Sequence, residues 1–212
     1  MRKNNIVIVD YGEGNINSIK RSFSTLGVSP IYSRNKDIIK EASALVMPGV
    51  GHFQTAMRFL IDNQLDIVLK QTVLEEKVPV LGICLGMQLM TKHSEEGNQK
   101  GLGWIDASVE KMEPRNRKLH KVPNIGWCLI KDDASLALIR GIACETSPFY
   151  FSHSYAARKF SVRNVKTSTF QYEDEYVALF ESENIFGVQF HPEKSHSAGV
   201  QLISNFLSKV RR

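Results

Sequence analysis

Residues 79–90 change from strand-like to helix-like spacing at a single cysteine, Cys84, and this change limits the folds open to the chain. Before Cys84 the run Pro-Val-Leu-Gly-Ile is typical of a short buried strand, and four residues after it follow at helical spacing: Leu85, Gln88, Leu89 and Lys92. Gly82 and Gly86 flank the cysteine and remove the side chains that would collide in a sharp strand-to-helix turn. Such a turn holds the sulfur at a helix N-terminus, where free N–H groups and the helix dipole favour the thiolate. Cys84 is therefore a candidate nucleophile, although a cysteine in an apolar strand also suits packing alone.

Strand and helix patterns alternate along the first half of the chain. Apolar runs predict strands at 6–10, 30–32, 44–47 and 78–83, and helical spacing separates them within 16–26, 37–41 and 53–76. This alternation implies parallel strands with helical crossovers, and so an α/β fold with a doubly wound, mostly parallel sheet. The turn at 11–15, the glycine loop at 48–51 and the turn at Cys84 all follow strands. We therefore expect them along one edge of the sheet.

The pattern changes after residue 97, where helical spacing becomes sparse. Short β segments are predicted at 107–112, 122–130, 149–153, 177–181 and 185–190, and we expect them to form a small mixed or antiparallel extension. A final helix follows Ser195 and Ser197, either of which can cap it. With no linker or repeat, residues 1–212 are expected to form one domain.

The composition excludes several classes of protein. With 42% hydrophobic and 23% charged residues, the chain is neither disordered nor membrane-spanning, and Asp10 ends the one apolar run that imitates a signal peptide. Three cysteines without a Cys-x-x-Cys pair indicate neither a disulfide framework nor a zinc site. We expect a cytoplasmic protein with reduced thiols and no metal.

Charge and glycine patterns argue against nucleic acids and nucleotides as ligands. The net charge of +5 is scattered, and the densest basic cluster lacks the interleaved aromatic residues that stack on bases: Arg115, Arg117, Lys118, His120 and Lys121. A solvated loop or a surface for an acidic protein partner fits this cluster. The turn at 11–15 has Asn17 where a dinucleotide loop needs glycine, and no Lys-Ser/Thr follows Pro48–His52. No cofactor is expected.

A second group of chemical side chains follows the predicted strand at 185–190. A cysteine nucleophile needs a nearby base, and the base needs a partner that fixes its tautomer. His191 and Glu193 are suitable types, because Pro192 between them lets the carboxylate point back at the imidazole. A His-Pro-Glu sequence at a strand end can also be only a turn.

Three motifs in this order resemble the class I (triad) glutamine amidotransferases. They are Pro-Gly-Val-Gly at 48–51, Gly-Ile-Cys-Leu-Gly-Met-Gln at 82–88 and Gly-Val-Gln-Phe-His-Pro-Glu-Lys at 187–194. The resemblance extends to Tyr-Gly-x-Gly-Asn at 11–15, Ser-Glu-Glu-Gly at 94–97 and Tyr-Phe-x-His-Ser-Tyr at 150–155, and it is greatest to the glutaminase subunits of imidazole glycerol phosphate synthases. It implies a flavodoxin-like sheet and hydrolysis of L-glutamine to glutamate and ammonia through a cysteine thioester.

The resemblance also implies roles for individual residues. Cys84 would be the nucleophile, His191 the general base and acid, and Glu193 its orienting partner. Backbone N–H groups of Leu85 and of Val50 and Gly51 would form the oxyanion hole. The glutamine pocket would be formed by Gln88, Glu95 or Glu96, His153, Ser154 and Tyr155.

The same resemblance implies a partner, because a glutaminase alone would only waste glutamine. That partner would be a (β/α)8-barrel synthase or cyclase subunit in a heterodimer, docked near Asn15, Asn124 and Trp127, which makes imidazole glycerol phosphate and AICAR in histidine biosynthesis. The family commonly has Pro-His-Met-Gly-Trp-Asn where this chain has Pro-Asn-Ile-Gly-Trp-Cys at 123–128. Glutaminases of surface-sugar biosynthesis, which Gly-Leu-Gly-Trp-Ile-Asp at 101–106 resembles, therefore stay an alternative, and a stand-alone cysteine hydrolase is a second one.

Overall fold

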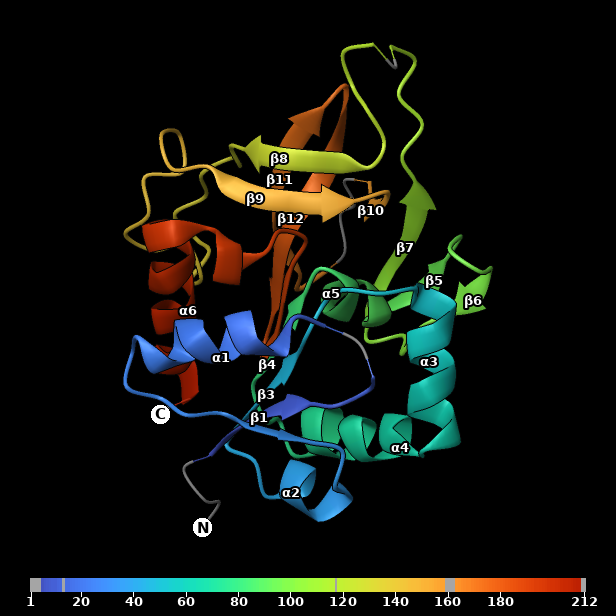
Figure 1. The fold of residues 1–212 in the computed structure, drawn as a ribbon, viewed down its shortest axis with the longest axis vertical. Helices are drawn as coiled ribbons and strands as arrows, with labels where there is room; N and C mark the ends of the chain where they lie inside the picture. The colour runs from blue at the N-terminus through green and yellow to red at the C-terminus, as the bar shows by residue number, and fades with distance from the viewer. Residues whose placement is uncertain (1–4, 13, 117, 159–162, 211–212) are drawn as a thin grey trace.

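The computed structural model describes residues 5–12, 14–116, 118–158 and 163–210. Its centre is a seven-stranded sheet in the order β11-β12-β13-β4-β3-β1-β2 (Figure 1). Five strands are parallel: β1 (Ile6–Val9), β2 (Ile31–Ser33), β3 (Ala44–Met47), β4 (Val80–Ile83) and β13 (Ile185–Val188). β12 (Asp174–Ser182) and β11 (Lys166–Tyr172) continue the sheet in antiparallel pairing. The predicted doubly wound, mostly parallel sheet is confirmed.

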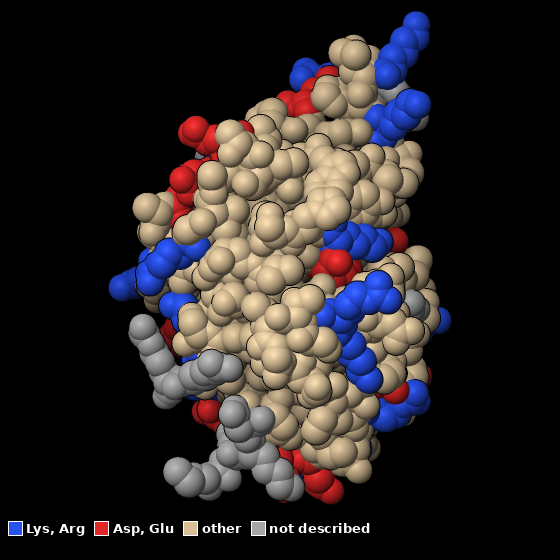
Figure 2. Space-filling view, turned by 60° about the vertical axis from the view of Figure 1, so that its left-hand side comes forward, with Lys and Arg blue, Asp and Glu red and all other residues tan. Residues whose placement is uncertain are grey.

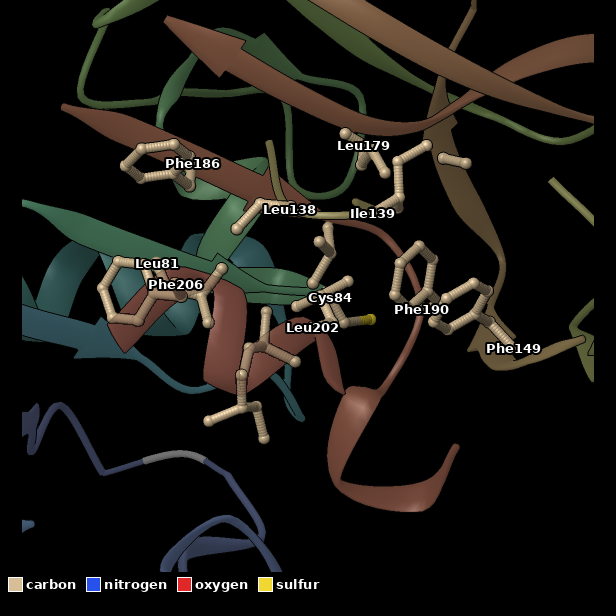
Figure 3. Close-up of a cluster of buried hydrophobic side chains, with 14 of the residues drawn as sticks. Leu81, Cys84, Leu138, Ile139, Phe149, Leu179, Phe186, Phe190, Leu202 and Phe206 are labelled. Carbon is tan, nitrogen blue, oxygen red and sulfur yellow. The ribbon is translucent and has the colours of Figure 1, made fainter. Parts of the chain in front are cut away.

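Helices cover both faces of this sheet, which is why β1, β3, β4 and β13 are buried throughout. One face packs against α1 (Ile16–Ser24) and α6 (His196–Val210), and the other against α2 (Lys36–Lys40), α3 (Phe53–Asp62) and α4 (Leu65–Lys70) (Figure 1). Because side chains alternate along a strand, Ile6 and Ile8 join the first core and Val7 and Val9 the second. Figure 3 shows part of the first core, in which Leu81, Phe190 and Leu202 lie with Cys84.

Two helical predictions need correction. The pattern at 53–76 is not one helix, because Gln64 adopts a left-handed φ of 56° between α3 and α4, and α4 continues as a π-helical turn, η1 (Gln71–Glu75). The helix after Cys84, α5 (Leu85–Leu89), is also shorter than its spacing suggests. The Thr91 hydroxyl donates to the Gln88 carbonyl at its end, and Lys92 lies in a strand instead.

The extension in the second half of the chain consists of two small sheets. A four-stranded mixed sheet has the order β10-β7-β5-β6 and contains β5 (Thr91–Ser94), β6 (Gln99–Lys100), β7 (Ile105–Lys111) and β10 (Tyr155–Ala157). β8 (Asn124–Cys128) and β9 (Phe149–His153) form a separate antiparallel pair. The predicted segments at 177–181 and 185–190 are not part of this extension, because β12 and β13 belong to the main sheet, where β13 pairs in parallel with β4.

The basic cluster lies in the loop between β7 and β8, which projects from the molecule (Figure 1). Arg115, Lys118 and Lys121 are exposed there, and Arg117 lies outside the described residues. In the part of the chain that is described, no helix has the length and apolar character needed to cross a bilayer. The three cysteines are free thiols.

Candidate active site

Cys84 lies in the sharp turn between β4 and α5, as its flanking glycines predicted. Its φ of 47° and ψ of −104° are unusual for a residue with a side chain, and its N–H donates to the Val188 carbonyl at 2.7 Å. A Cβ on Gly86 would lie 2.1 Å from the Met47 oxygen, and one on Gly82 would lie 2.7 Å from the Gly86 backbone. Both glycines are therefore required by close backbone packing around the turn.

His191 and Glu193 form a buried pair beside Cys84. Pro192 opens the 3-10 turn η2 (Pro192–Lys194), and within this turn His191 Nδ1 lies 2.8 Å from Glu193 Oε1. The two side chains are 2% and 1% exposed, so the carboxylate accepts from Nδ1–H without competition from water. This contact leaves Nε2 of the ring to face the Cys84 thiol.

The electrostatics of the pair favour the protonated imidazole. Burial opposes its charge, but the hydrogen bonds with Cys84 and Glu193 and the charges of both groups outweigh burial and raise the pKa of His191 to about 10. The ring is therefore suited to take and hold a proton from the thiol.

The base is also fixed through its backbone. The His191 N–H donates to the Tyr150 carbonyl of β9 at 2.8 Å, and the Ser195 hydroxyl donates to the His191 carbonyl at 2.6 Å. The same hydroxyl accepts from the Tyr150 N–H at 3.0 Å. Ser195 thus joins the base to β9 with its side chain, and as the residue directly before α6 it accepts from the Gly199 N–H with its carbonyl. Ser197 lies inside α6, so the alternative cap at Ser197 is wrong.

The glycine loop at 48–51 packs directly on the cysteine turn. A Cβ on Gly49 would lie 1.7 Å from the Ile83 oxygen and 2.8 Å from the Leu85 nitrogen. The N–H groups of Val50, Gly51 and Leu85 donate to no other described residue. All three residues line the same cavity as Cys84.

A cavity of about 270 Å³ opens over Cys84 and His191. The other predicted site residues on its wall are Val50, Gly51, Leu85, Gln88, Glu96, His153, Ser154 and Tyr155. Four further residues line it that the sequence did not indicate: Gly49, Pro123, Ser152 and Lys194. Ser152 was missed although it is next to the predicted His153, and Lys194 was missed although it ends the motif at 187–194.

Of two neighbouring glutamates, Glu96 lines the cavity and Glu95 does not. Glu96 Oε2 accepts from the Phe53 N–H at the start of α3 at 2.8 Å. Glu95 is exposed, and its carboxylate accepts from the Lys111 N–H at 2.7 Å, outside the cavity. Of the two predicted alternatives, the structure places Glu96 in the site and Glu95 outside it.

His153 and Gln88 hold the opposite wall through one backbone carbonyl. His153 Nδ1 lies 2.9 Å from the Tyr155 oxygen, and burial lowers the pKa of His153 to about 4, so its ring is neutral. Gln88 Nε2 donates to the same oxygen at 2.9 Å and to Gln189 Oε1 at 3.0 Å. Gln189 has no predicted role, although its position two residues before His191 places both side chains on one side of the strand end.

The predicted docking residues differ in exposure. Asn15 is exposed at the N-cap of α1, and Trp127 is 47% exposed and stacks on His196 with ring centroids 4.9 Å apart. Ile125 in β8 and Leu129 directly after it are also exposed apolar side chains. Figure 2 shows a broad area without charged side chains on one face of the molecule. Asn124 is 2% exposed and faces inward. Contrary to the prediction, its side chain is therefore not available to a partner.

Among the described residues, no group of His, Cys, Asp or Glu is arranged to hold a metal ion. The site brings together a thiol, an imidazole with a carboxylate partner, and free backbone donors. In chemical terms, this arrangement suits acyl transfer from an amide or ester.

Comparisons with known proteins point to the same chemistry. The model of the family "Glutamine amidotransferase class-I" matches residues 7–210. Imidazole glycerol phosphate synthase subunit HisH 2 of Methanococcus maripaludis is 41% identical over 97% of this chain and 100% of the relative, and its namesake in Pseudomonas aeruginosa is 38% identical over 97% and 100%. A crystal structure of a glutamine amidotransferase shares the fold with a TM-score of 0.73 at 18% identity, covering 97% of this chain and 99% of the other. The chain therefore belongs to the class I glutamine amidotransferase family, among relatives named as HisH subunits of imidazole glycerol phosphate synthase.

Proposed function

We propose that this glutamine amidotransferase hydrolyses L-glutamine to glutamate and ammonia through a thioester on Cys84. The observation that carries the proposal is the arrangement of Cys84, His191 and Glu193 at one end of the cavity. His191 Nε2 takes the thiol proton while the sulfur attacks the amide carbon of glutamine, and Glu193 stabilises the imidazolium. The free N–H groups of Leu85 and of the Val50 and Gly51 segment then hold the oxyanion.

The second half of the reaction reuses the same base. The His191 imidazolium donates its proton to the leaving nitrogen, which departs as ammonia when the carbon–nitrogen bond breaks. The neutral ring then takes a proton from a water molecule that attacks the thioester carbon. Breakdown of this second tetrahedral intermediate releases glutamate and returns the proton to Cys84.

The wall of the cavity accounts for recognition of an amino acid. Glu96 uses Oε2 on the Phe53 N–H, which leaves Oε1 to bind the α-ammonium group of glutamine. We assign this role to Glu96 and not to Glu95, whose carboxylate is engaged outside the cavity. Ser154 and Tyr155 form the adjoining wall, and Gln88 and His153 support it from behind.

The relatives are named as subunits of a synthase, and we infer a synthase partner for this chain as well. The partner would be a (β/α)8-barrel synthase or cyclase that receives the ammonia in a heterodimer and makes imidazole glycerol phosphate and AICAR in histidine biosynthesis. Trp127 and Asn15 would lie in the contact, since both are exposed. Residues 1–212 would act as one amidotransferase domain.

A second candidate is a paralogous glutaminase that supplies ammonia to surface-sugar biosynthesis. Asn124 and Cys128, which depart from the common family pattern, lie in β8 beside the exposed Trp127. Offering the chain both kinds of barrel subunit tests directly which of them it binds.

The experiment combines one variant with two nitrogen sources. The purified chain is mixed with the imidazole glycerol phosphate synthase barrel subunit of the same organism, and synthesis is measured with glutamine or with an ammonium salt. Cys84→Ala should abolish glutamine-dependent synthesis and leave the ammonium-dependent reaction intact. Cys128→Ser and Cys144→Ser are the matched controls and should retain both.

Two outcomes would contradict the proposal. If an assembled complex with Cys84→Ala loses both reactions, Cys84 does not act only in ammonia release. If the chain fails to bind the histidine-pathway barrel but binds a sugar-modifying one, the pathway changes to the second candidate while the glutaminase chemistry stands.

A further inference from the structure

Gln189 is a fully buried side chain that contacts the sulfur of Cys84 without lining the cavity. It is 0% exposed and follows β13, two residues before His191. Its Nε2 lies 3.4 Å from Cys84 Sγ, and its Oε1 accepts from Gln88 Nε2 at 3.0 Å. A buried carboxamide beside the nucleophile needs a reason, because an apolar side chain of the same size would fill the space without polar atoms to satisfy.

The hydrogen bonds determine which end of the Gln189 carboxamide faces the sulfur. Gln88 contacts the Tyr155 carbonyl, which can only accept, so the Gln88 atom at this contact must be the nitrogen. The same nitrogen contacts Gln189, which must therefore present its oxygen to Gln88. The N–H groups of Gln189 then point at Cys84. A backbone carbonyl thus sets the direction of the whole series of contacts.

We propose that Gln189 is a catalytic residue that donates a hydrogen bond to the Cys84 sulfur, and that Gln88 positions it for this task. The proposal rests on the thioester chemistry proposed above. Unlike His191, the carboxamide does not titrate, so it stabilises negative charge on the sulfur at every stage of the reaction without removing a proton. In a buried site this donor has no competing water, and a hydrogen bond to a charged group is stronger than one between neutral groups.

The contact also directs the sulfur. Cys84 has an unusual backbone conformation, and its side chain lies between His191 on one side and Gln189 on the other. With two fixed polar neighbours, the sulfur is held toward the cavity. Because Gln189 touches the nucleophile and not the cavity, its removal should lower kcat and leave KM for glutamine nearly unchanged.

The test compares two substitutions of similar size that should disturb the sulfur to different degrees. Gln189→Met removes the donor, and Gln189→Glu replaces it with an acceptor of the same shape. Both are made in the full-length chain with Cys128→Ser and Cys144→Ser, so that iodoacetamide reports Cys84 alone. Gln201→Met, at an exposed position on α6, is the matched control. Glutamate release with the barrel subunit, alkylation rate against pH, and thermal unfolding are measured for each.

We expect Gln189→Met to lower kcat about tenfold and to move the pH midpoint of alkylation upward by about one unit. Gln189→Glu should lower kcat about a hundredfold or more, because a carboxylate repels the thiolate. Gln201→Met should match the parent chain in all measurements. If Gln189→Met does not fold, the same-shape variant Gln189→Glu still provides the kinetic and alkylation readouts.

The inference is overturned if both variants keep the parent kcat and alkylation midpoint, or if they change only KM or the unfolding temperature. Cys84→Ala in the same assay separates this result from a failure of the proposed function. Glutaminase activity in Cys84→Ala would overturn the thioester chemistry itself. An inactive Cys84→Ala together with unaffected Gln189 variants would overturn only the role of Gln189.

Discussion

An alanine at position 49 would force the glycine loop away from the cysteine turn. Its Cβ would lie 1.7 Å from the Ile83 oxygen, whereas real Cβ contacts stay beyond 3.0 Å, so the loop or the turn must move by about 1.3 Å. The Ile83 backbone is held in β4 between β3 and β13 and cannot yield easily. The displacement therefore falls on residues 48–51, which carry the proposed oxyanion donors.

The size of the effect on catalysis follows from this displacement. A shift of about 1 Å in a positioned group can cost about a hundredfold in rate, and loss of one oxyanion donor costs a hundredfold to a thousandfold in kcat. We therefore expect Gly49→Ala to lower the kcat of glutaminase by about two to three powers of ten. The overlap should also lower the free energy of unfolding by about 1–3 kcal/mol.

The assay separates the oxyanion hole from the nucleophile. Glutamate release gives kcat, and iodoacetamide alkylation of Cys84, in a chain with Cys128→Ser and Cys144→Ser, should stay within a few-fold of the parent because the loop does not form the thiolate. Gly27→Ala is the control, since Gly27 has a φ of 72° but no atom within 4 Å of the added Cβ. It should cost about 1 kcal/mol of stability and no activity. Parental kcat in Gly49→Ala, or equal losses of turnover and alkylation, would refute the reasoning.

Three further predictions concern the base, the pH dependence of stability and the docking surface. His191→Ala should reduce the turnover of glutamine by about a thousandfold or more, and Glu193→Gln should reduce it by less. The double variant should be little worse than His191→Ala. If the reductions in turnover instead multiply in the double variant, the two residues act independently. The free energy of unfolding should be greatest near pH 6.5. It should fall as the pH rises toward 10, because folding raises the pKa of His191 to about 10. It should also fall as the pH drops toward 4, because folding lowers the pKa of His153 to about 4. Urea unfolding from pH 4.5 to 9.5 checks this, since His191→Gln should flatten the upper limb and His153→Gln the lower, and unchanged slopes would contradict it. Trp127→Ala should weaken binding of the barrel subunit at least about tenfold with little change in unfolding temperature, and the equally apolar, exposed Ile67→Ala should leave binding unchanged in titration calorimetry.

The sequence by itself determined the parts of the site that depend on short spacing. Gly82 and Gly86 around Cys84 indicated a sharp turn, and the turn is there because close backbone contacts leave no room for a side chain. His191 and Glu193 could be paired from the sequence because a proline turn brings residues two apart together. The buried runs of β1, β3 and β4 were visible for a similar reason, since covered parallel strands are continuously apolar.

Other features depended on which segments pack together, and this cannot be inferred from the local spacing of residues. The spacing of Leu85 to Lys92 suits a longer helix, but pairing of Thr91–Ser94 with β7 ends α5 at Leu89. Asn124 stands in a motif expected at a surface, but the β8 and β9 pair turns it inward. Glu95 and Glu96 are adjacent and chemically alike, and only their different neighbours, Lys111 and Phe53, separate them.

Gln189 illustrates the difference most clearly. The sequence places it near His191, but its contact with Cys84 joins residues 105 positions apart, and its orientation depends on Gln88 and on the Tyr155 carbonyl. Those three segments meet because β13 pairs with β4 and β10 lies beside β7 and β12. Local sequence therefore indicated the proposed nucleophile and base. The tertiary structure decided which carboxamide donates to the sulfur, because that choice is made by strand pairing and not by spacing along the chain.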